Sequence, residues 1–288
     1  MKYAIIGSAG QVGQEFAKFL RADSFFPLSH EDVDVTDAVA VERALAAVDC
    51  DVVVNLAAFH NVNGCEENAV KAFQVNAVGA YNVARAAVRG GCKPVYLSSD
   101  YVFGPDHQRR TPYVETDEVG PLNVYGASKV AGEHLVRAAT QNHLILRTSS
   151  LFGAVRSRKG WTFPEMMIER ARAGQPLRVV KDQYMSPTYT FDLVRAVIAL
   201  LEAGATGTIH VTSGDGCTWY EFAVATLELA GMNCPIEPVT SDAFPSKARR
   251  PSYSRLDSER LSGFGVAPLR HWRDALQAYL QEKREVAD

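Results

Sequence analysis

Three side chains in the middle of the chain could transfer a proton to a carbonyl oxygen. Tyr125 precedes Lys129 by four residues in the stretch GPLNVYGASKVAGE, and Ser99 ends the apolar run KPVYLSS. Residues four apart on a helix share a face, so Tyr125 and Lys129 can point into one cleft. An ammonium near a phenol favours the phenolate, which predicts a lowered pKa for Tyr125 and a role in proton transfer.

The spacing of this pair is weak evidence by itself, because a chain of this composition contains Y-x-x-x-K by chance with a probability of roughly one third. An ordinary amphipathic helix is therefore the alternative interpretation of Tyr125 and Lys129. The context favours chemistry, because Ser99 lies at the carboxyl end of a strand, where doubly wound sheets place their ligands. A hydroxyl, a phenol and an amine that converge there indicate a carbonyl-reducing site.

A glycine-rich turn follows the first apolar run, in the stretch GSAGQVG. Glycines permit a tight turn and let the backbone approach a pyrophosphate, whose charge suits a helix N-terminus. A plain turn is the alternative, but the position between the first strand and the first helix favours a dinucleotide site. The residues expected to contact the cofactor are Gly7, Gly10, Gln11, Val12 and Gly13.

The end of the second strand bears on the choice of cofactor. NAD sites usually carry a carboxylate there for the ribose 2′-hydroxyl, whereas this chain places Ser29 and His30 in FFPLSHEDVDVTD. A hydroxyl and an imidazole can hydrogen-bond to a 2′-phosphate, so we expect NADPH, with NADH as the less favoured cofactor. If the strand ends later, Asp32 or Asp34 binds the ribose instead.

Further polar and small residues accompany these motifs. The run VVVNLAAF ends in small residues, Ala57 and Ala58, where the backbone would pass close to a cofactor. Asn76 interrupts a helical pattern, so it is either a surface position or holds a kink and a water near the active site. Asp37, before AVAVERAL, is expected to cap a helix.

The elements that must position these residues alternate along the chain. Apolar runs such as KYAIIG, DVVVNLAA, KPVYLSS and HLILRTS alternate with helical patterns, which predicts βαβ units and a parallel sheet. The runs are apolar on consecutive residues, as expected when helices cover both faces of a doubly wound α/β fold. We predict a dinucleotide-binding domain over 1–152 and 184–212, and a smaller α+β substrate-binding lobe over 153–183 and 213–288.

The composition excludes several classes of protein. With 47% hydrophobic and 22% charged residues and a formal net charge of -3, the chain has no electrostatic footprint for nucleic acid. The five cysteines show neither C-x-x-C spacing nor a metal-site pattern, and are expected to be reduced, mostly buried thiols. The sequence shows no signal peptide or membrane span, so we expect a cytoplasmic protein without a metal.

With these residues in hand, the chain resembles the extended short-chain dehydrogenase/reductases, and among them most closely the dTDP-4-dehydrorhamnose reductases. The G-x-x-G-x-x-G spacing is typical of the wider family. The closer resemblance extends over nearly the whole length and rests on DVVVNLAA, SSDYVFG, PYVETDEVGPLNVYGASKVAGE, LILRTS, VVKDQYMSPTYTFDLV and ARRPSYSRLD. It implies NADPH-dependent reduction of a keto group on a nucleotide-linked deoxysugar.

The resemblance also implies roles for single residues. Tyr125 would be the general acid, Lys129 would hold the nicotinamide ribose and tune Tyr125, and Ser99 would orient the carbonyl. Asn76 would hold a water that returns a proton to Tyr125. On the substrate side, the resemblance places Asp100 and Tyr101 at the sugar, and Arg249 or Arg250 near the nucleotide, where a solvated surface pair is the alternative.

Two departures from the family pattern concern the substrate. Ser150 stands where the family commonly has a tryptophan that packs on the sugar, and SRKGWTF replaces a more usual KGxNF. Trp161 could compensate from this loop, or it could belong to the core of the lobe.

Two other functions fit part of the pattern. A nucleotide-sugar epimerase or dehydratase with bound NAD would favour a carboxylate at the second strand end, and a dehydratase would need an acid pair where Asp100 is followed by Tyr101. A non-catalytic NADP-binding regulatory subunit would not need Ser99, Tyr125 and Lys129 intact. A homodimer is usual in this superfamily, and the amphipathic C-terminal stretch HWRDALQAYLQEK is expected to pack inward.

Overall fold

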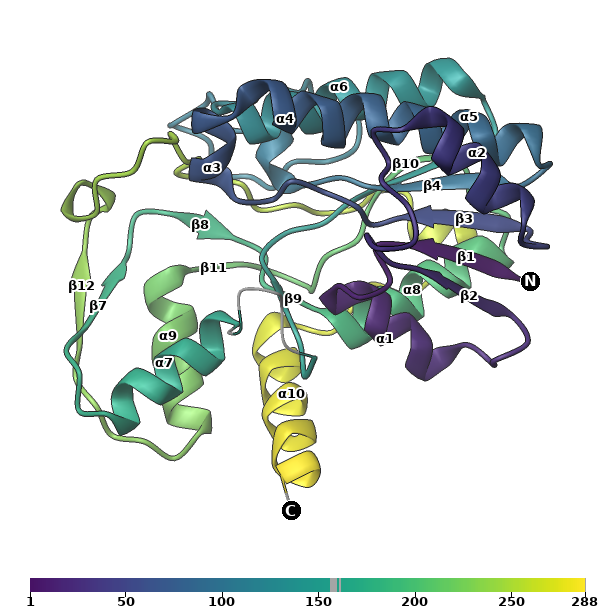
Figure 1. Ribbon diagram of the computed structural model, residues 1–288. Helices are drawn as coiled ribbons and strands as arrows, with labels where there is room; N and C mark the ends of the chain where they lie inside the picture. Colours follow the sequence, from purple (N-terminus) through teal and green to yellow (C-terminus); the bar gives the residue numbers. More distant parts are fainter. Residues whose placement is uncertain (156–159, 161, 288) are drawn as a thin grey trace.

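The protein is built around a parallel six-stranded sheet in a computed structural model that describes residues 1–155, 160 and 162–287 (Figure 1). The strand order is β10-β5-β4-β3-β1-β2, and every neighbouring pair is parallel. This confirms the predicted doubly wound α/β fold. The strands are β1 (Tyr3–Ile6), β2 (Phe25–Leu28), β3 (Val52–Asn55), β4 (Lys93–Leu97), β5 (Leu144–Arg147) and β10 (Gly207–His210).

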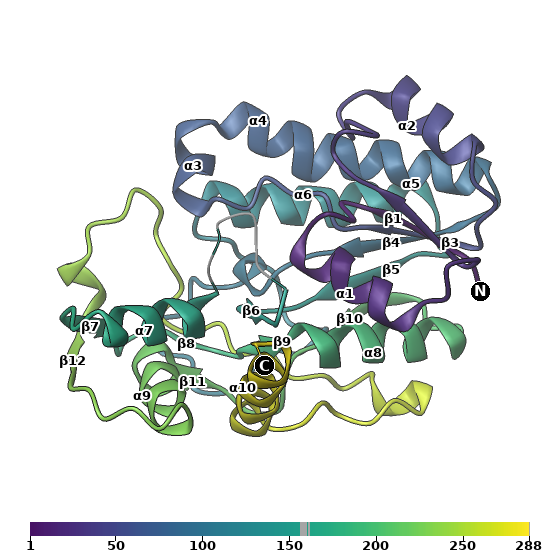
Figure 2. The ribbon, with the colours of Figure 1, turned by 60° about the horizontal axis from the view of Figure 1, so that its bottom comes forward.

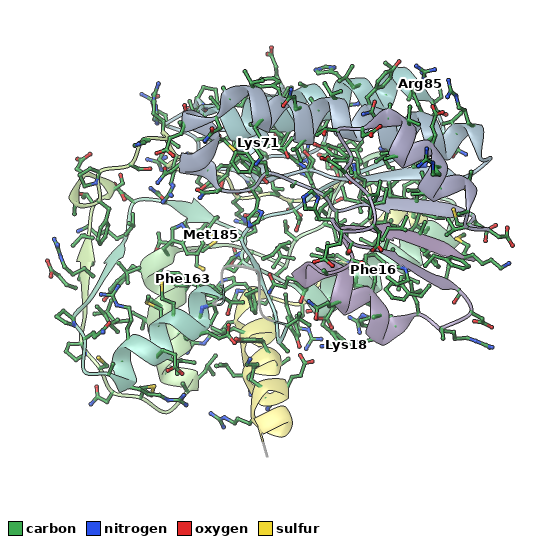
Figure 3. All side chains as sticks on the ribbon, in the orientation of Figure 1. Phe16, Lys18, Lys71, Arg85, Phe163 and Met185 are labelled. Carbon is green, nitrogen blue, oxygen red and sulfur yellow. The ribbon has the colours of Figure 1, made fainter. Side chains whose placement is uncertain are left out.

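Helices cover both faces of the sheet (Figure 2). Alternate residues of β1 point to opposite faces, so Tyr3 and Ile5 pack in one apolar cluster while Ala4 and Ile6 pack in another. The first cluster includes Phe16, which is 1% exposed, whereas Lys18 on the same helix is exposed (Figure 3). One face carries α1 (Gln11–Phe19) and α8 (Thr190–Glu202); the other carries α2 (Ala38–Ala46), α5 (Ala80–Arg89) and α6 (Val124–Ala139).

Short polar side chains begin several of these helices. Asp37 accepts hydrogen bonds from the backbone of Val39 and Ala40 at the start of α2, which confirms its predicted capping role. Thr162 and Thr218 each form a capping box, at the starts of α7 (Phe163–Arg172) and α9 (Trp219–Leu229). Sequence-local hydrogen bonds therefore fix where these helices begin.

A smaller lobe stands beside the carboxyl ends of the strands (Figure 1). Its helices α7 and α9 pack together around an apolar cluster that includes Met167, Leu177 and Leu227. Short strand pairs complete it and join it to the sheet domain: β7 (Leu177–Val180) with β12 (Ile236–Val239), β8 (Tyr184–Met185) with β11 (Cys217–Thr218), and β6 (Leu151–Phe152) with β9 (Thr188–Tyr189).

The chain crosses between the two parts more than once. It returns to the sheet domain through α8 and β10, as expected, and β10 pairs with β5. Leu261, Val266 and Leu269 also pack in the core of the sheet domain, although the predicted division assigns them to the lobe. The exact division of the chain stays a prediction.

The C-terminal helix α10 (Trp272–Ala287) buries its apolar face, as predicted. Trp272, Leu276 and Tyr279 pack with Phe152 and Phe222 in one cluster. Among the described residues, no helix is both long and apolar enough to cross a membrane. None of the five cysteines forms a disulfide, and three of them are buried: Cys65, Cys92 and Cys217.

Candidate active site

A cavity of about 720 Å³ opens at the carboxyl ends of the strands, where the sheet domain meets the lobe. Its walls come from the glycine turn, the exits of β2, β3, β4 and β5, helix α6, and the start of α7 and α9. Most of the predicted site residues line it: Gly7, Gly10, Gln11, Val12, Ser29, His30, Ala57, Ala58, Ser99, Asp100, Tyr125 and Lys129.

The glycine turn needs glycine for two separate reasons. Gly7 has a φ of 81°, in the left-handed region that side chains disfavour. A Cβ on Gly13 would lie 2.5 Å from the Cα atom of Ser8, so Gly13 permits close packing of α1 on the turn instead of lining the cavity. Helix α1 then begins at Gln11 with its free backbone N–H groups at the cavity.

Replacing Gly13 with alanine is expected to destabilise the protein by about 1–3 kcal/mol, because the added methyl must displace the Ser8 backbone. Urea unfolding would measure this loss. Gly263→Ala is the matched control, because Gly263 has no atom within 4 Å of an added Cβ. Equal stability of the two variants would contradict the packing role of Gly13.

The exit of β2 matches the prediction. The strand ends at Leu28, and Ser29 and His30 follow it into the cavity wall. Asp32 does not line the cavity, and its carboxylate accepts a hydrogen bond of 2.7 Å from the backbone of Ser29. Asp34 does line the cavity, but its Oδ1 atom accepts from the backbone and hydroxyl of Thr36.

Helix α6 carries the tyrosine and the lysine into the same cavity. Asn123 caps the helix, accepting a 2.8 Å hydrogen bond from Gly126 and donating one of 2.8 Å to the backbone oxygen of Arg249. A Cβ on Gly126 would lie 2.1 Å from the backbone oxygen of Tyr101, so the start of α6 packs directly on the residues that follow β4. Tyr125 therefore faces the end of β4 where Ser99 lies.

The electrostatics of Tyr125 differ from the prediction. Burial raises the pKa of Tyr125, a hydrogen bond with Ser99 opposes this rise, and the charge of Asp100 adds to it. The predicted lowering by Lys129 is wrong for this state, because the Lys129 ammonium donates to the Leu97 oxygen at 2.6 Å instead. Tyr125 is therefore protonated at neutral pH, as a general acid must be.

Lys129 is buried against the sheet. It is 1% exposed, and its Nζ atom lies 4.1 Å from the centre of the Tyr96 ring. Burial lowers the pKa of Lys129 to about 7, while the nearby charge of Glu133 raises it. Lys129 therefore changes its charge close to neutral pH, which makes it sensitive to any anion that enters the cavity.

Asn76 lies in a π-helical segment, η1 (Gln74–Gly79), between α4 (Ala69–Phe73) and α5. A π-helical turn is the kind of kink that the sequence suggested. The Asn76 amide is fully buried and bonds to both backbone groups of Phe59 and to Ser128, and its backbone oxygen accepts from Tyr96 at 2.7 Å. Asn76 does not line the cavity, and its role in holding a water stays a prediction.

Ser99 and Asp100 follow β4 at the start of a short 3-10 turn, η2 (Asp100–Val102). The Asp100 carboxylate is 3% exposed and accepts three serine hydroxyls: Ser99 at 3.0 Å, Ser149 at 2.9 Å and Ser254 at 2.7 Å. Burial raises the pKa of Asp100 to about 6, although these hydrogen bonds lower it. Both carboxylate oxygens are thus occupied by the protein itself.

Several predicted substrate residues lie around this corner. Tyr101 does not line the cavity, but its ring meets that of Tyr125 edge-on with centres 6.0 Å apart. Arg250 is exposed, outside the cavity wall, and its charge acts on Tyr101. Ser150 lines the cavity with a φ of 44°, a strained value for serine. Trp161 lies outside the described residues.

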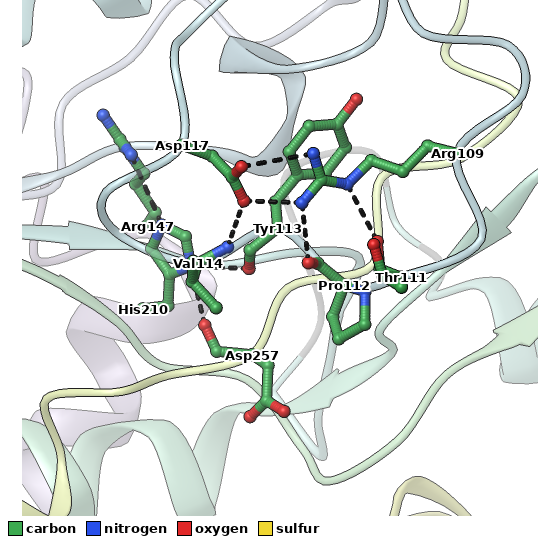
Figure 4. Close-up of polar contacts among 9 residues, drawn as sticks. All are labelled: Arg109, Thr111, Pro112, Tyr113, Val114, Asp117, Arg147, His210 and Asp257. Carbon is green, nitrogen blue, oxygen red and sulfur yellow. Dashed lines mark hydrogen bonds and ion pairs between the residues drawn. The ribbon is translucent and has the colours of Figure 1, made fainter.

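The loop between β4 and α6 is held by a polar cluster (Figure 4). The Arg109 guanidinium donates to both oxygens of Asp117, at 3.2 and 2.6 Å, and lies 3.8 Å from the centre of the Tyr113 ring. Burial lowers the pKa of His210 to about 4, so Nε2 of its neutral ring can accept from Arg147 at 3.3 Å. Its Nδ1 atom can then donate to the backbone oxygens of Asp257 at 2.9 Å and Tyr113 at 3.2 Å.

Sequence reasoning missed several residues of the cavity wall. Phe163, Trp219 and Phe222 come from the lobe and form an aromatic wall, with the Phe163 and Trp219 ring centres 4.7 Å apart. Ser149, which bonds to Asp100, and Lys71 of α4 were also missed. Ser149 lies two residues after the end of β5, so its position at a strand exit is a signal that could have identified it.

Comparison with known proteins places this site in a family. A family model described as the RmlD substrate binding domain matches residues 1–285. The spore coat polysaccharide biosynthesis protein SpsK of Bacillus subtilis is 38% identical over 100% of this chain and 99% of its own length. The dTDP-4-dehydrorhamnose reductase of Mycolicibacterium smegmatis is 38% identical over 96% of this chain and 84% of its own length.

Solved structures of dTDP-4-dehydrorhamnose reductases have the same fold. The Clostridium acetobutylicum dTDP-4-dehydrorhamnose reductase superposes with a TM-score of 0.92 at 36% identity, over 99% of this chain and 100% of that one. The Bacillus anthracis dTDP-4-dehydrorhamnose reductase in complex with NADP has a TM-score of 0.92 at 32% identity, over 98% of this chain and 100% of that one.

The fold and the cavity are those of an extended short-chain dehydrogenase/reductase. The class is defined here by the doubly wound sheet, the glycine turn, and the grouping of Ser99, Tyr125 and Lys129. Within that class, the chain belongs to the dTDP-4-dehydrorhamnose reductase family. The family resemblance seen in the sequence is thereby confirmed.

Proposed function

We propose that this protein reduces a keto group on a nucleotide-linked deoxysugar, with NADPH as the reductant. The observation that carries the proposal is that one cavity begins at the glycine turn and contains Ser99, Tyr125 and Lys129 at its other end. Relatives named as a dTDP-4-dehydrorhamnose reductase and a dTDP-4-keto-6-deoxy-D-glucose reductase support this reaction class.

The residues at the β1 end of the cavity fit a dinucleotide. The start of α1 presents backbone N–H groups, and the side-chain Nε2 atom of Gln11 is buried in the cavity wall without a hydrogen-bond partner. A pyrophosphate oxygen would satisfy such donors. At the β2 exit, Ser29 and His30 line the cavity, Asp32 does not, and Asp34 lines it with its Oδ1 atom bonded to Thr36. A hydroxyl and an imidazole directly after the strand support NADPH over NADH.

When bound, the reduced nicotinamide would supply the hydride to the ketone carbon. Tyr125 would give its proton to the oxygen, since its raised pKa keeps it protonated until negative charge develops there. Ser99 would align that oxygen from the exit of β4. Lys129 would hold the nicotinamide ribose, and its positive charge would favour the phenolate that Tyr125 becomes.

The lobe would bind the rest of the substrate. The aromatic wall of Phe163, Trp219 and Phe222 lines the same cavity as Ser150 and suits the apolar face of a deoxysugar. Asp100 and Tyr101 would contact the sugar, and Arg250 would lie toward the nucleotide end of the substrate. The division into a dinucleotide-binding domain and a substrate lobe, the homodimer and the cytoplasmic location are parts of the same proposal.

A panel of nucleotide-linked ketosugars, each assayed with NADPH and NADH, tests this function. We expect turnover with at least one dTDP-4-keto-6-deoxysugar and a higher kcat/KM with NADPH than with NADH. NAD that co-purifies with the protein, with no net oxidation of added NADPH, would indicate the epimerase or dehydratase alternative. A stoichiometric partner without turnover on any sugar would indicate the regulatory subunit.

A further inference from the structure

Asp100 is a buried carboxyl group in the active site with no ion-pair partner among the described residues. Its partners are three serine hydroxyls from separate parts of the chain. A charged carboxylate in such a place is costly, because its Coulomb partners and its water are both missing. The carboxyl group therefore needs an explanation beyond contact with the sugar.

The charge state of Asp100 decides the direction in which the Ser99 hydroxyl donates its hydrogen. A serine hydroxyl has one hydrogen to donate and two lone pairs that accept. In the ionised state, that hydrogen is directed at the Oδ1 atom of Asp100, 3.0 Å away. The remaining contacts of Ser99, with the backbone N–H of Tyr101 at 3.1 Å and with Tyr125, must then be accepted by Ser99.

Ser99 in this state cannot stabilise a carbonyl oxygen. Negative charge develops on that oxygen during reduction, and only a donor pointing at it lowers the barrier. A Ser99 hydroxyl held by ionised Asp100 would present lone pairs to the oxygen, which would repel it.

We propose that Asp100 works as a neutral carboxylic acid that donates to Ser99, so that the Ser99 hydroxyl is free to donate to the substrate oxygen. Asp100 is then a positioning residue that acts through Ser99, and its proton stays on the carboxyl group during the reaction. Tyr125 remains the group that gives up a proton. This inference rests on the reduction proposed above.

The geometry indicates which oxygen carries the proton. Among the described side chains, Ser149 and Ser254 donate to Oδ2, at 2.9 and 2.7 Å, and Ser99 donates to Oδ1. The backbone N–H of Asp100 also bonds to its own carboxyl group. A proton on Oδ1 reverses one hydrogen bond and leaves the other two intact. The same carboxyl group can therefore be neutral without losing any partner.

The surroundings of Asp100 do not hold it ionised, and its neutral form is well populated at mildly acidic pH. Its pKa of about 6 is raised by burial. The facing phenols of Tyr101 and Tyr125 both have raised pKa values and stay neutral, and the exposed cation Arg250 acts on Tyr101. Lys129 is held at the Leu97 oxygen. Negative charge that develops on a substrate oxygen would raise the pKa of Asp100 further.

The test compares the pH dependence of kcat/KM in the wild type and in Asp100→Asn. The asparagine amide can direct its NH₂ group at Ser99 and its oxygen at Ser149 and Ser254, so it imitates the neutral acid at every pH. We expect the wild-type value to fall as the pH rises through about 6. Asp100→Asn should retain activity within about tenfold of the wild-type maximum and decline only near the Lys129 pKa of about 7.

Two further variants sharpen the test. Asp100→Ala lacks the donor, and we expect it to lose about 10²- to 10³-fold in kcat at all pH values. Ser254→Ala removes one hydrogen-bond donor to the Asp100 carboxylate, which should raise the pKa of Asp100. In this variant, kcat/KM should therefore decline at a higher pH than in the wild type. Because Asp100→Ala could fail to fold, the Asp100→Asn profile carries the decision.

A readout without substrate separates this inference from the proposed function. Carbon-13 NMR of labelled aspartate carboxyl groups should show one signal that titrates near pH 6 and is missing in Asp100→Asn. If the wild type reduces no ketone, the proposed function fails whatever the NMR shows. If the wild type is active but Asp100→Asn is as impaired as Asp100→Ala, Asp100 acts as a carboxylate and the inference is overturned.

Discussion

Tyr125→Phe is expected to lower kcat for ketone reduction by about 10²- to 10⁴-fold, because it removes the hydroxyl that we propose as the proton donor to the product oxygen. The phenylalanine ring fills nearly the same space, so the edge-on contact with Tyr101 and the start of α6 should survive. The Kd for NADPH should change by no more than about twofold, because Lys129 and the glycine turn are untouched. Steady-state assays and fluorescence titration with NADPH measure the two effects separately.

A second tyrosine variant serves as the control for Tyr125→Phe. Tyr81→Phe is the matched control, because it removes a phenol from helix α5 outside the cavity wall and should leave kcat unchanged. Undiminished turnover by Tyr125→Phe would show that another group supplies the proton. The raised pKa of Tyr125 also predicts that its own ionisation does not limit the rate below pH 9, so the declines near neutrality must come from other groups.

The sequence predicts the sheet and its ligand edge because the relevant signals are local. Consecutive apolar residues mark strands buried on both faces, and the residues just after them, such as Ser29 and Ser99, must meet at one edge of a parallel sheet. Four-residue spacing places Tyr125 and Lys129 on one face of α6 in the same way. These predictions depend only on periodicity and chain order.

The features that the sequence predicts wrongly or does not predict depend on contacts between distant segments. Ser254 reaches Asp100 across 154 residues, and no local pattern announces such a hydrogen bond. The pKa of Tyr125 was predicted from its spacing to Lys129, but burial dominates it, and the ammonium turns to a backbone oxygen instead. The aromatic wall from α7 and α9 is hidden for the same reason, because the position of the lobe over the sheet is a tertiary property.

Behind the active site, a buried ion pair fixes the orientation of α6. Glu133 and Arg147 have side chains that are 1% and 4% exposed, and the guanidinium donates to both carboxylate oxygens at 2.9 and 2.8 Å. The Glu133 carboxylate also accepts from Ser98 at 2.6 Å and from Arg137 at 3.0 Å. One side chain on α6 thus joins the exits of β4 and β5, one helical turn after Lys129.

Glu133→Ala is expected to lower the free energy of unfolding by about 3–5 kcal/mol, because it leaves the Arg147 charge buried without its carboxylate. Urea denaturation measures the loss. Glu169→Ala is the matched control, since Glu169 pairs with Arg172 on an exposed surface and should change stability by less than about 0.5 kcal/mol. A similar small effect of both substitutions would mean that Arg147 finds another partner or water.

The sign of the pH dependence follows from the same contacts. Burial raises the pKa of Glu133, but the hydrogen bonds and charge of Arg147 outweigh this and hold it below its usual value. The stabilisation is therefore complete above the unfolded-state pKa of about 4.3 and is lost as the pH falls through the lower, folded-state value. Glu133→Gln, which cannot ionise, should lose less stability than the wild type over this acidic range. Because the Glu133 charge also raises the pKa of Lys129, Glu133→Gln should shift the decline of kcat/KM that follows Lys129, near pH 7, to lower pH, an effect that lost stability alone would not produce.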